Sequence, residues 1–355
     1  MIKETLQKFI AEESLSIAQA MAKIDENSKG ILFVVDDGRL TGCLTDGDIR
    51  RWLIKTGDLH ADIVKAMNCQ PQKLSTDKKS QAVVVMSKHH INAVPIVDTE
   101  NQIVDIVFKL ADEQLEEKEE KDSLKDVPVI IMAGGKGTRL YPYTKILPKP
   151  LIPIGDIPIL ERIINCFVKY DINQYFLTVN YKKEMIKSYF SELDPNYSVQ
   201  YVEENKPLGT AGSIRLIKQK FDVPVFVTNC DSIIQADYAD IYRYHKESGN
   251  AMTIVSALKN VVIPYGVLNS KENGVLISME EKPSLSYFIN TGMYVINPDV
   301  IDKIPMDTFF HMTHLADVLM KEGHQVGMYP VSEDSFLDMG ELEEMRRMEE
   351  KLNIK

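Results

Sequence analysis

The sequence has few cysteines and lacks long apolar segments. The four cysteines of the 355-residue chain are widely separated and form no C-x-x-C pair. This spacing argues against a disulfide framework or a zinc site and favours a reducing compartment, so we expect a cytoplasmic protein. No apolar run approaches the ~20 residues that span a bilayer, and the first twenty residues lack the apolar core of a signal peptide.

Basic residues are fewer than acidic ones. The chain has 52 acidic and 41 basic residues, which gives a formal net charge of −11 at pH 7. Binding to nucleic acid or to an anionic membrane requires a basic surface, so the composition predicts neither partner. A phosphate-bearing substrate would need a local cluster of lysine and arginine. Apolar residues (44%) and charged residues (26%) are close to globular averages, and the length indicates two or three domains.

A run of charged residues at 112–126 separates two parts of the chain. We interpret it as an exposed helix or linker; the alternative is a solvated helix end within one domain. Before it, residues 1–111 contain the order helix, strand, turn, strand, helix twice, at about 1–60 and 61–111. Such repetition indicates an internal duplication. Because neither unit is large enough for a generous core, we expect the two to pack on each other.

The first unit contains a short motif, Gly42-Cys43-Leu44-Thr45-Asp46-Gly47-Asp48. It resembles the G-h-h-T-x-x-D element of CBS domains, and the two units together resemble a small α+β CBS-domain pair. The resemblance implies that Thr45 and Asp48 contact the phosphate and ribose of a regulatory nucleotide. The alternative is that both side chains only cap the following helix. The second unit lacks the Gly, the Thr and the terminal Asp at residues 105–111, which argues against a second nucleotide site.

A glycine-rich loop follows the apolar segment 127–132, which we interpret as a strand. The loop reads Ala133-Gly134-Gly135-Lys136-Gly137-Thr138-Arg139-Leu140, and its backbone N–H groups could cradle a phosphate. It matches neither the Walker A pattern G-x-x-x-x-G-K-[ST] nor the dinucleotide pattern G-x-G-x-x-G. These mismatches argue against a P-loop NTPase and against an NAD-dependent dehydrogenase.

The residues after this loop include Pro142, Thr144 and the segment Pro148-Lys149-Pro150. Together with the loop they resemble the signature G-G-x-G-[ST]-R-L-x-P-x-T…P-K-P of the sugar-1-phosphate nucleotidylyltransferases. Weaker similarities continue in order through residues 127–355. The resemblance implies a Rossmann-like α/β domain with a mostly parallel mixed sheet and flanking helices. It also implies Mg²⁺-dependent transfer of a nucleotidyl group from a nucleoside triphosphate to a sugar 1-phosphate, with release of pyrophosphate.

Such a reaction brings two anions together, so their repulsion must be neutralised. Arg139 offers a planar fork that suits phosphate oxygens, and Lys149 offers a compact charge on a stiff Pro-Lys-Pro segment. Catalysis then consists of positioning and charge stabilisation. The family resemblance assigns Arg139 and Lys149 to the triphosphate. It implies a nucleotide-binding set of Ala133, Gly134, Gly135, Gly137, Thr138, Glu204, Gly209 and Thr210.

Residues 203–212, which read EENKPLGTAG, resemble the family's base-recognition loop, and we expect a helix at 213–220. One carboxylate can accept both adjacent donors of guanine, N1–H and N2–H₂. Uracil and thymine offer a single donor flanked by acceptors. We therefore expect Glu204, or else Glu203, to favour GTP. The alternatives are that both glutamates are solvated, or that the enzyme uses CTP, UTP or dTTP.

Two aspartates match the family's Mg²⁺ ligands. Asp231, to which we also assign a catalytic role, follows the apolar strand 224–228, and Asp338 lies in an Asp-Met-Gly context. Two hard oxygen ligands together with phosphate oxygens suit Mg²⁺. The pair His311 and His314 has no carboxylate motif beside it and is interpreted as structural. The resemblance places the sugar 1-phosphate at Tyr265, Gly266, Glu281, Lys282 and Asn290.

The combination of a CBS pair with a transferase domain resembles guanylyltransferases that supply GDP-sugars for surface glycans or nonulosonic acids. It suggests a hexose or hexosamine 1-phosphate, with glucosamine 1-phosphate and mannose 1-phosphate as candidates. We expect a homo-oligomer, and the CBS pair adds a candidate site for a regulatory nucleotide. The alternative from another class is a catalytically silent CBS nucleotide sensor. The glycine loop, Arg139 and both aspartates argue against it.

Overall fold

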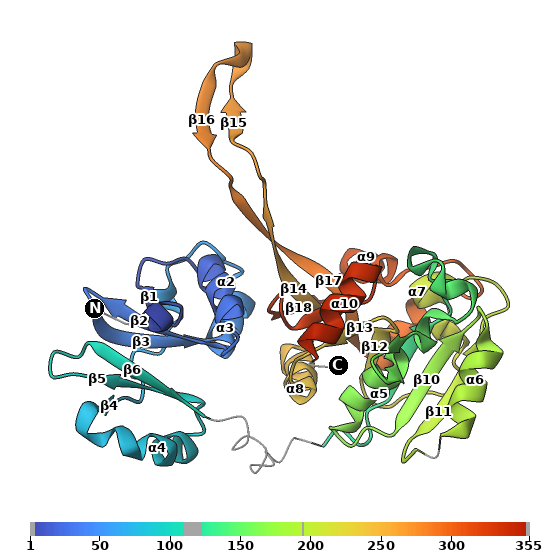
Figure 1. Ribbon diagram of the computed structural model, residues 1–355. Helices are drawn as coiled ribbons and strands as arrows, with labels where there is room; N and C mark the ends of the chain where they lie inside the picture. The colour runs from blue at the N-terminus through green and yellow to red at the C-terminus, as the bar shows by residue number, and fades with distance from the viewer. Residues whose placement is uncertain (1–3, 110–122, 194, 353–355) are drawn as a thin grey trace. The chain divides into compact units, whose positions relative to one another are not determined.

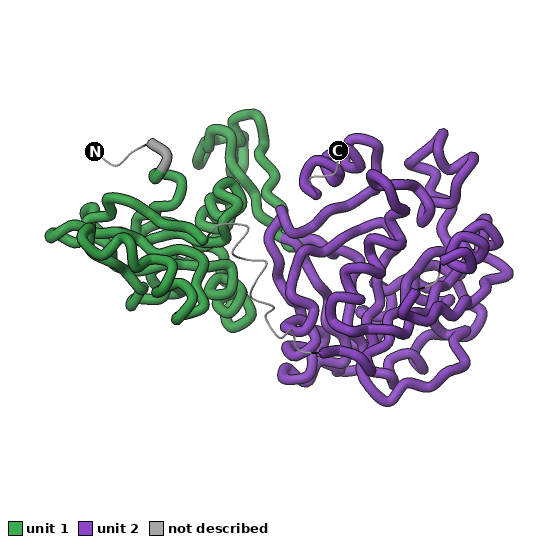
Figure 2. Tube along the Cα trace, turned by 60° about the horizontal axis from the view of Figure 1, so that its bottom comes forward, with its two compact units in different colours: residues 1–120, 258–288 green, residues 121–257, 289–355 purple. Residues whose placement is uncertain are grey.

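The computed structural model describes residues 4–109, 123–193 and 195–352 (Figure 1). The chain divides into two compact units, residues 1–120 with 258–288 and residues 121–257 with 289–355 (Figure 2). Most of the linker expected at 112–126 lies outside the described residues. The segment 258–288, which we expected within the domain 127–355, groups with the first unit. Among the described residues, no helix is long and apolar enough to cross a membrane.

The first unit contains two three-stranded sheets with the same pairing pattern. In each sheet the first strand is parallel to the second, and the second is antiparallel to the third. Each central strand also has one register shift near its end, at Val34/Val35 and at Ile96/Val97. This repetition is what an internal duplication produces. The strands are β1 (Ile10–Glu12), β2 (Ile31–Asp36), β3 (Arg39–Thr45), β4 (Leu74–Ser75), β5 (Ala93–Val97) and β6 (Ile103–Phe108).

Amphipathic helices cover these sheets. In α2 (Ile17–Asn27) the buried residues recur at helical spacing, and Ser16 and Gln19 form a capping box at its start. This face packs against α3 (Asp46–Thr56) in a cluster that also contains Leu258 and Phe288, so the core of the first unit draws on distant parts of the sequence. The remaining helices of this unit are α1 (Glu4–Gln7) and α4 (Ala82–His89).

The second unit is built on a seven-stranded sheet in the order β11-β10-β7-β12-β17-β14-β18. The pairs β11–β10, β10–β7, β7–β12 and β14–β18 are parallel, and β12–β17 is antiparallel, which matches the mostly parallel mixed sheet that we expected. The strands are β7 (Val129–Ala133), β10 (Gln174–Val179), β11 (Ser198–Glu203), β12 (Val225–Asn229), β14 (Met252–Val262), β17 (Ser284–Ile296) and β18 (Val326–Val331).

Hydrophobic clusters cover both faces of this sheet. The strand β7 is buried along its whole length, as a central parallel strand should be. Its odd-numbered residues pack into one cluster with α5 (Ile159–Val168), α6 (Lys183–Glu192) and α8 (Tyr238–Ser248). Its even-numbered residues pack into a second cluster with α9 (Met312–Lys321). The period of two in the strand therefore separates two layers of helices.

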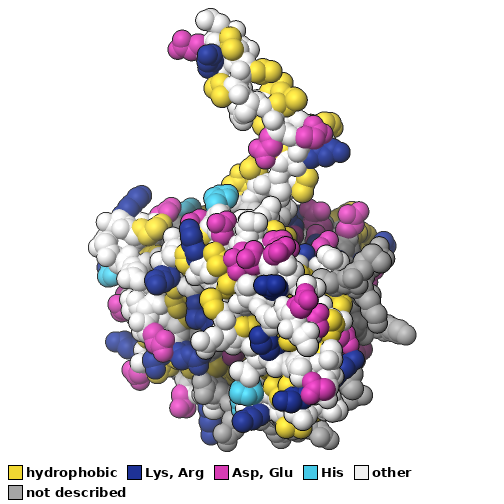
Figure 3. Space-filling model, turned by 90° about the vertical axis from the view of Figure 1, so that its left-hand side faces the viewer, with side chains coloured by type: hydrophobic (Ala, Val, Ile, Leu, Met, Phe, Trp, Pro, Cys, Tyr) yellow, Lys and Arg dark blue, Asp and Glu magenta, His cyan; other side chains and the backbone are white. Residues whose placement is uncertain are grey.

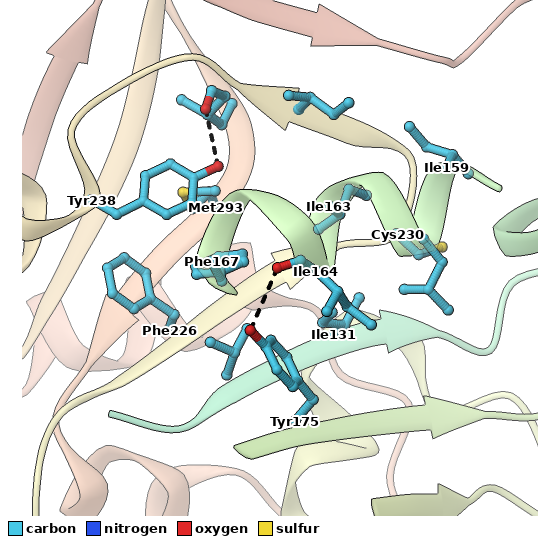
Figure 4. Packing of buried hydrophobic residues seen from close by; sticks show 14 of the residues in the cluster. Ile131, Ile159, Ile163, Ile164, Phe167, Tyr175, Phe226, Cys230, Tyr238 and Met293 are labelled. Carbon is cyan, nitrogen blue, oxygen red and sulfur yellow. Dashed lines mark hydrogen bonds between the residues drawn. The ribbon is translucent and has the colours of Figure 1, made fainter. Parts of the chain in front are cut away.

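Aromatic side chains fill the larger of these clusters (Figure 4). The rings of Phe167 and Phe226 meet edge to face, with 5.4 Å between their centroids, and Phe167 lies 4.6 Å from the ring of Tyr238. Buried phenols need a hydrogen-bond acceptor. The hydroxyl of Tyr238 donates to the carbonyl of Ile234 at 3.0 Å, and that of Tyr175 donates to the carbonyl of Ile172 at 3.0 Å.

The remaining elements are a hairpin and several short strands and helices. The distal parts of β14 and β17 continue into a two-stranded hairpin of β15 (Val267–Ser270) and β16 (Leu276–Glu280) (Figure 1). The other elements are β8 (Pro153–Ile154) paired with β9 (Ile157–Pro158), β13 (Ser232–Ile234) paired with β19 (Phe336–Asp338), α7 (Gly209–Gly212) and α10 (Leu342–Lys351).

Candidate active site

The candidate site lies where two neighbouring parallel strands end. The strand β7 leads into the glycine loop, and β12 leads into Asn229-Cys230-Asp231. Because parallel strands end at the same edge of a sheet, these loops meet there. They form a pocket of about 460 Å³. Its lining includes Gly134, Gly135, Gly137, Thr138, Arg139, Lys149, Glu204, Leu208, Gly209, Thr210, Asp231, Phe309 and His311. Ala133 is buried at the end of β7.

Two of the loop glycines are required by packing within the site. A Cβ atom on Gly134 would lie 2.5 Å from Glu204 Oε1. Gly137 has a φ of +64°, and a Cβ there would lie 2.9 Å from the side chains of both Lys149 and Thr144. Around Gly135, in contrast, the space for a Cβ is open. Gly134 and Gly137 therefore hold the loop against the neighbouring segments, while Gly135 borders the free space of the pocket.

The ammonium of Lys149 forms an ion pair with the carboxylate of Asp231. The Lys149 residue is only 7% exposed, and the Asp231 side chain is also largely buried. Because a buried ion pair with good geometry fixes both partners, the charge of Lys149 has a defined position at the pocket wall. The sequence-based assignment of both residues to one site is therefore compatible with the geometry.

The second aspartate, Asp338, lies beside Asp231. The strands β13 and β19 pair Ser232 with Asp338, and the N–H of Met339 donates to the carbonyl of Asp231 at 2.8 Å. Burial raises the pKa of the Asp338 carboxyl, and the negative charge of Asp231 raises it further. The positive charges of Lys149 and Arg139 act in the opposite direction. The charges of Asp231, Lys149 and Arg139 therefore all act on the Asp338 carboxyl.

The donor set suits magnesium better than a structural zinc. The described part of the chain has no group of three or more histidine, cysteine or acidic side chains able to hold a metal ion. Zinc in a structural site takes four protein ligands, whereas Mg²⁺ commonly takes one or two carboxylates with water and substrate phosphate oxygens. Burial, and after it the charge of Asp231, raises the pKa of Asp338, and a divalent cation between the two carboxylates would offset both effects.

The two adjacent glutamates at the base-recognition loop have different surroundings. Glu204 is buried and lines the pocket, and its Oε2 accepts the N–H of Leu208 at 3.1 Å. Burial raises the pKa of this carboxyl, and the Leu208 bond partly offsets the effect. Glu203 is instead exposed and is bound by Lys183 and Lys187 of α6, whose hydrogen bonds lower its pKa to about 2. Of the two, only Glu204 faces the pocket.

A wall of the pocket comes from a segment that sequence analysis missed. The carbonyl of Phe310 accepts the N–H groups of Ala211 at 2.9 Å and Gly212 at 3.1 Å, so this segment packs on the base-recognition loop. Phe309 lies in the wall with its ring edge-to-face with His311, at 4.7 Å between centroids. The Nδ1 of His311 accepts the N–H of Thr210 at 3.4 Å, which ties this wall to the base-recognition loop.

Two glycines in the sequence, Gly209 and Gly212, are the feature that could have indicated this wall. A Cβ on Gly209, whose φ is +77°, would lie 2.6 Å from the carbonyl oxygen of Phe310, and a Cβ on Gly212 would lie 2.5 Å from that of Thr308. Both glycines are therefore needed because another backbone approaches them. The helix expected at 213–220 does not form: α7 spans Gly209–Gly212, and only a short 3₁₀ turn, Ile214–Leu216, follows.

The five residues assigned to the sugar phosphate fall into two groups. Asn290 lies in β17, where its side chain accepts the N–H of Gly292 at 2.9 Å and donates to the hydroxyl of Tyr294 at 2.9 Å. Its polar atoms therefore order this strand. The other four, Tyr265, Gly266, Glu281 and Lys282, belong to the segment 258–288, which groups with the first unit. None of the five is among the residues that line the pocket.

The two residues of the CBS motif cap a helix and also line a cavity. The Thr45 hydroxyl accepts the N–H of Asp48 at 3.3 Å, and Asp48 Oδ2 accepts the N–H of Thr45 at 2.9 Å, which is a capping box at the start of α3. Both also line a cavity of about 570 Å³ that Lys29, His89 and other residues of both repeats enclose. Capping and ligand contact are therefore compatible in this geometry.

Comparisons with known proteins match the N-terminal and C-terminal parts of the chain to two different families. The nucleotidyl transferase family matches residues 128–353, and the CBS domain family matches residues 7–55. A mannose-1-phosphate guanyltransferase of Debaryomyces hansenii is 37% identical over 186 residues, which cover 50% of this chain and 51% of that protein. A UTP–glucose-1-phosphate uridylyltransferase of Synechocystis sp. is 35% identical over 196 residues, which cover 50% of each protein.

The chain thus spans about half the length of the curated relatives it matches. Among solved structures, that of HddC from Yersinia pseudotuberculosis has a TM-score of 0.51 and 26% sequence identity, and the match covers 64% of this chain and 99% of HddC. The fold of about two thirds of this chain is therefore shared with a protein of known structure.

Proposed function

The chain belongs to the nucleotidyl transferase family and has an N-terminal CBS domain, and from this premise we propose that it is a sugar-1-phosphate nucleotidylyltransferase. It transfers a nucleotidyl group from a nucleoside triphosphate, with GTP favoured, to a hexose or hexosamine 1-phosphate. The products are an NDP-sugar and pyrophosphate. The observation that supports this proposal is that Arg139, Lys149 and Asp231 line the glycine-loop pocket while Asp338 lies beside Asp231.

In this mechanism the chain's own residues bring two anions together. The N–H groups of the glycine loop and the side chains of Arg139 and Lys149 bind the triphosphate. A phosphate oxygen of the sugar 1-phosphate attacks the α-phosphorus, and pyrophosphate leaves. Because Lys149 is already fixed by Asp231, little ordering is required when the substrate binds. Asp231 and Asp338 would hold Mg²⁺, which supplies positive charge at the phosphate oxygens.

The preference for GTP rests on Glu204. Its carboxylate lines the pocket and keeps acceptor capacity beyond its bond to the N–H of Leu208. Guanine offers two adjacent donors to such a group. The relatives are named for both guanylyl and uridylyl transfer, at 37% and 35% identity, so the base is proposed from the site and not from overall similarity. Glucosamine 1-phosphate and mannose 1-phosphate are the sugar candidates, for synthesis of surface glycans or nonulosonic acids.

A matrix of GTP, CTP, UTP, dTTP and ATP against a panel of sugar 1-phosphates tests this proposal, with pyrophosphate release as the readout. We expect turnover only with Mg²⁺ and the highest kcat/KM with GTP. Glu204→Gln should lower kcat/KM for GTP by about 10- to 100-fold and leave the other triphosphates nearly unchanged. A highest rate with UTP or dTTP contradicts the base assignment. No turnover with any pair favours the silent CBS sensor.

The CBS cavity is proposed as a regulatory nucleotide site. Thr45 and Asp48 lie at the N-terminus of α3, where backbone N–H groups favour a phosphate, and Lys29 adds a positive charge to the same cavity. Titration of the full chain with AMP, ATP and GTP, followed by calorimetry, tests this. Binding that persists in an Asp231→Asn variant and is lost in Asp48→Ala would support it.

A further inference from the structure

Two neighbouring residues in the connection between β10 and α6 bind backbone carbonyls of another loop. The hydroxyl of Tyr181 donates to the carbonyl of Thr144 at 3.1 Å. The ammonium of Lys182 donates to the carbonyl of Ile146 at 2.7 Å and also to that of Lys145. These three carbonyls are successive and close a short 3₁₀ turn, and the last carbonyls of a turn find no partner within it. Tyr181 and Lys182 therefore form a clamp on the carbonyls of this loop.

The clamped segment, residues 141–147, joins the two residues that we assign to the triphosphate. It lies between Arg139 of the glycine loop and Lys149 of the Pro-Lys-Pro segment, and both of these residues line the pocket. Thr144 of the clamped segment is buried. A Cβ on Gly137 would lie 2.9 Å from the methyl group of Thr144 and 2.9 Å from the Cβ of Lys149. The position of Thr144 therefore limits how the glycine loop and the Lys149 segment approach each other.

The backbone of Lys182 has a conformation that disfavours lysine. Lys182 is the N-cap of α6 and has φ +50° and ψ +35°, in the left-handed region. Glycine and asparagine adopt this conformation more readily than a residue with a long side chain. The side chain of Lys182 does not cap the helix either. A residue kept in an unfavourable conformation indicates a functional constraint, and the two carbonyl bonds are what lysine supplies here.

The partners of Lys182 differ from those of the lysines that follow it. Surface lysines usually lie among acidic side chains, as on the face shown in Figure 3. Lys183 and Lys187 of α6 follow this pattern, because both bind the carboxylate of Glu203. Lys182 instead binds carbonyls, and its ammonium lies 5.5 Å from the centroid of the Tyr181 ring. Hydrogen bonds from a charged donor are roughly twice as strong as neutral ones, so the clamp holds its segment firmly.

We propose that Tyr181 and Lys182 are positioning residues for triphosphate binding, which hold the segment 141–147 so that Arg139 and Lys149 reach the phosphates together. The inference rests on the proposed binding of the triphosphate by Arg139 and Lys149. Neither clamp residue is among those that line the pocket, so both act through the segment that they hold. Without the clamp, the three carbonyls would turn towards water and the spacing of the two cations would no longer be fixed.

The variant Lys182→Asn tests the proposal, because asparagine keeps the left-handed backbone but is too short to reach the carbonyls. KM for GTP should rise about 5- to 20-fold, and KM for the sugar 1-phosphate should change less than about 2-fold. KM does not depend on how much of the preparation is folded, so a general loss of structure would not raise it. Lys182→Arg, which can still bind two carbonyls, should keep KM for GTP within about 3-fold of wild type.

Matched controls separate the clamp from its surroundings. Lys183→Asn, at the next position, removes an ion pair with Glu203 and should leave KM for GTP unchanged. Tyr181→Phe should raise KM for GTP about 2- to 5-fold, because one of the three carbonyl bonds is lost. Its control is Tyr242→Phe in α8, which removes a phenol bond to the carbonyl of Pro224 and should have no effect on KM.

Calorimetric titration with GTP and Mg²⁺ tests the clamp without turnover. In an Asp48→Ala background, in which binding to the CBS cavity should be lost, Lys182→Asn should raise Kd for GTP about 5- to 20-fold. A chain that shows this rise but no turnover supports the clamp and contradicts the proposed reaction. Normal KM and Kd for GTP in Lys182→Asn, or an equal rise in Lys183→Asn, overturn the clamp and leave the reaction in place. A wild-type chain that binds no GTP overturns both.

Discussion

The negative charge of Asp338 lowers the stability of the folded chain. Burial and the neighbouring charge of Asp231 raise the pKa of its carboxyl in the folded chain. The unfolded chain keeps the ordinary pKa, so the folded state holds the proton more tightly. The ionised carboxylate therefore lowers stability at neutral pH, and this penalty disappears as the pH falls below the ordinary value, where both states are protonated.

Replacing Asp338 by Asn should separate stability from activity. In EDTA at pH 7.5, Asp338→Asn should raise the thermal unfolding midpoint by about 1–3 °C, because the amide has no charge to bury. The difference from wild type should shrink towards pH 4. The same variant should lose at least about 1,000-fold in kcat. Asp222→Asn, at an exposed position, should change neither quantity. A D338N enzyme with normal turnover would contradict the metal assignment.

Phe309 and His311 should contribute to nucleotide binding without taking part in the chemistry. Both line the pocket, their rings meet edge to face, and His311 also accepts the N–H of Thr210 in the base-recognition loop. Phe309→Ala and His311→Ala should each raise KM for the triphosphate about 5- to 20-fold and change kcat less than about 3-fold, because only binding is lost. Met306→Ala, in the same segment but outside the pocket lining, serves as the control. An unchanged KM in both variants would show that this wall does not touch the nucleotide.

Among the elements, the close contact between the base-recognition loop and the segment 308–311 controls the shape of the pocket. A methyl group on Gly209 would meet the Phe310 carbonyl oxygen, whereas Gly249, at a similar φ of +65°, has open space around it. Both Gly→Ala variants carry the strain of a positive φ, about 1–2 kcal/mol. Only Gly209→Ala adds a clash with another backbone.

We therefore expect Gly209→Ala to lower the free energy of unfolding by about 1–3 kcal/mol more than Gly249→Ala, measured by urea denaturation. Gly209→Ala should also raise KM for the triphosphate, and Gly249→Ala should not. Equal losses of stability and equal KM values in the two variants would mean that the loop moves freely away from Phe310.

The junction between α8 and the sheet contains a buried histidine. His245 lies between the hydroxyl of Thr253 at 2.9 Å and the side-chain oxygen of Asn297 at 3.1 Å. Burial lowers its pKa. The unfolded chain binds the proton more readily, so stability contributed by neutral His245 is present above the ordinary pKa of 6.5 and is lost as the pH falls from there towards the lower folded value.

The pH dependence of unfolding should reveal this histidine. Between pH 7.5 and 5.5 the wild-type midpoint should fall more steeply than that of His245→Gln, which can still hydrogen-bond but does not titrate. His324→Gln, at a partly exposed ion pair with Glu322, is the comparison and should follow the wild type closely. If the unfolding midpoints of wild type and H245Q fall in parallel with pH, the assignment of this pH dependence to His245 is refuted.

At the scale of the whole molecule, the two compact units should respond to ligands separately. Their cores are distinct clusters, and the pocket lies entirely in the second unit. Differential scanning calorimetry should therefore resolve more than one transition. Adding GTP with Mg²⁺ to the Asp48→Ala variant, in which nucleotide binding to the CBS cavity should be lost, should raise one midpoint and leave the other within about 1 °C, since a ligand stabilises only the part that binds it. A single transition that shifts as a whole would show that the units unfold together.

Local patterns in the sequence predicted most elements but not the contacts between distant segments. The strands 127–132 and 224–228 were predicted from apolar runs next to Gly134 and Asp231, because a buried parallel strand leaves a clear signal. The wall around Phe309 could not be predicted, since it depends on a backbone contact between residues 100 positions apart. The helix expected at 213–220 was wrong, because only the short turn Ile214–Leu216 forms there.

The assignment of residues to the two compact units was harder to predict than their secondary structure. The hairpin segment 258–288 continues β14 and β17 in sequence, so its composition gave no sign that it groups with the N-terminal repeats. Leu258 and Phe288 nevertheless pack with α2 and α3. Burial of two apolar side chains in a remote core leaves no periodic pattern. The sugar-phosphate roles of Glu281 and Lys282 on this segment stay predictions.

The discontinuity of the first unit affects how the protein is made. Residues 1–120 emerge from the ribosome first, but the positions for Leu258 and Phe288 in their core stay empty until residues 121–257 have been translated. At about 5–20 residues per second this takes on the order of ten to thirty seconds. During that interval the nascent N-terminal half exposes an incomplete core, and chaperones would have their main opportunity to bind it.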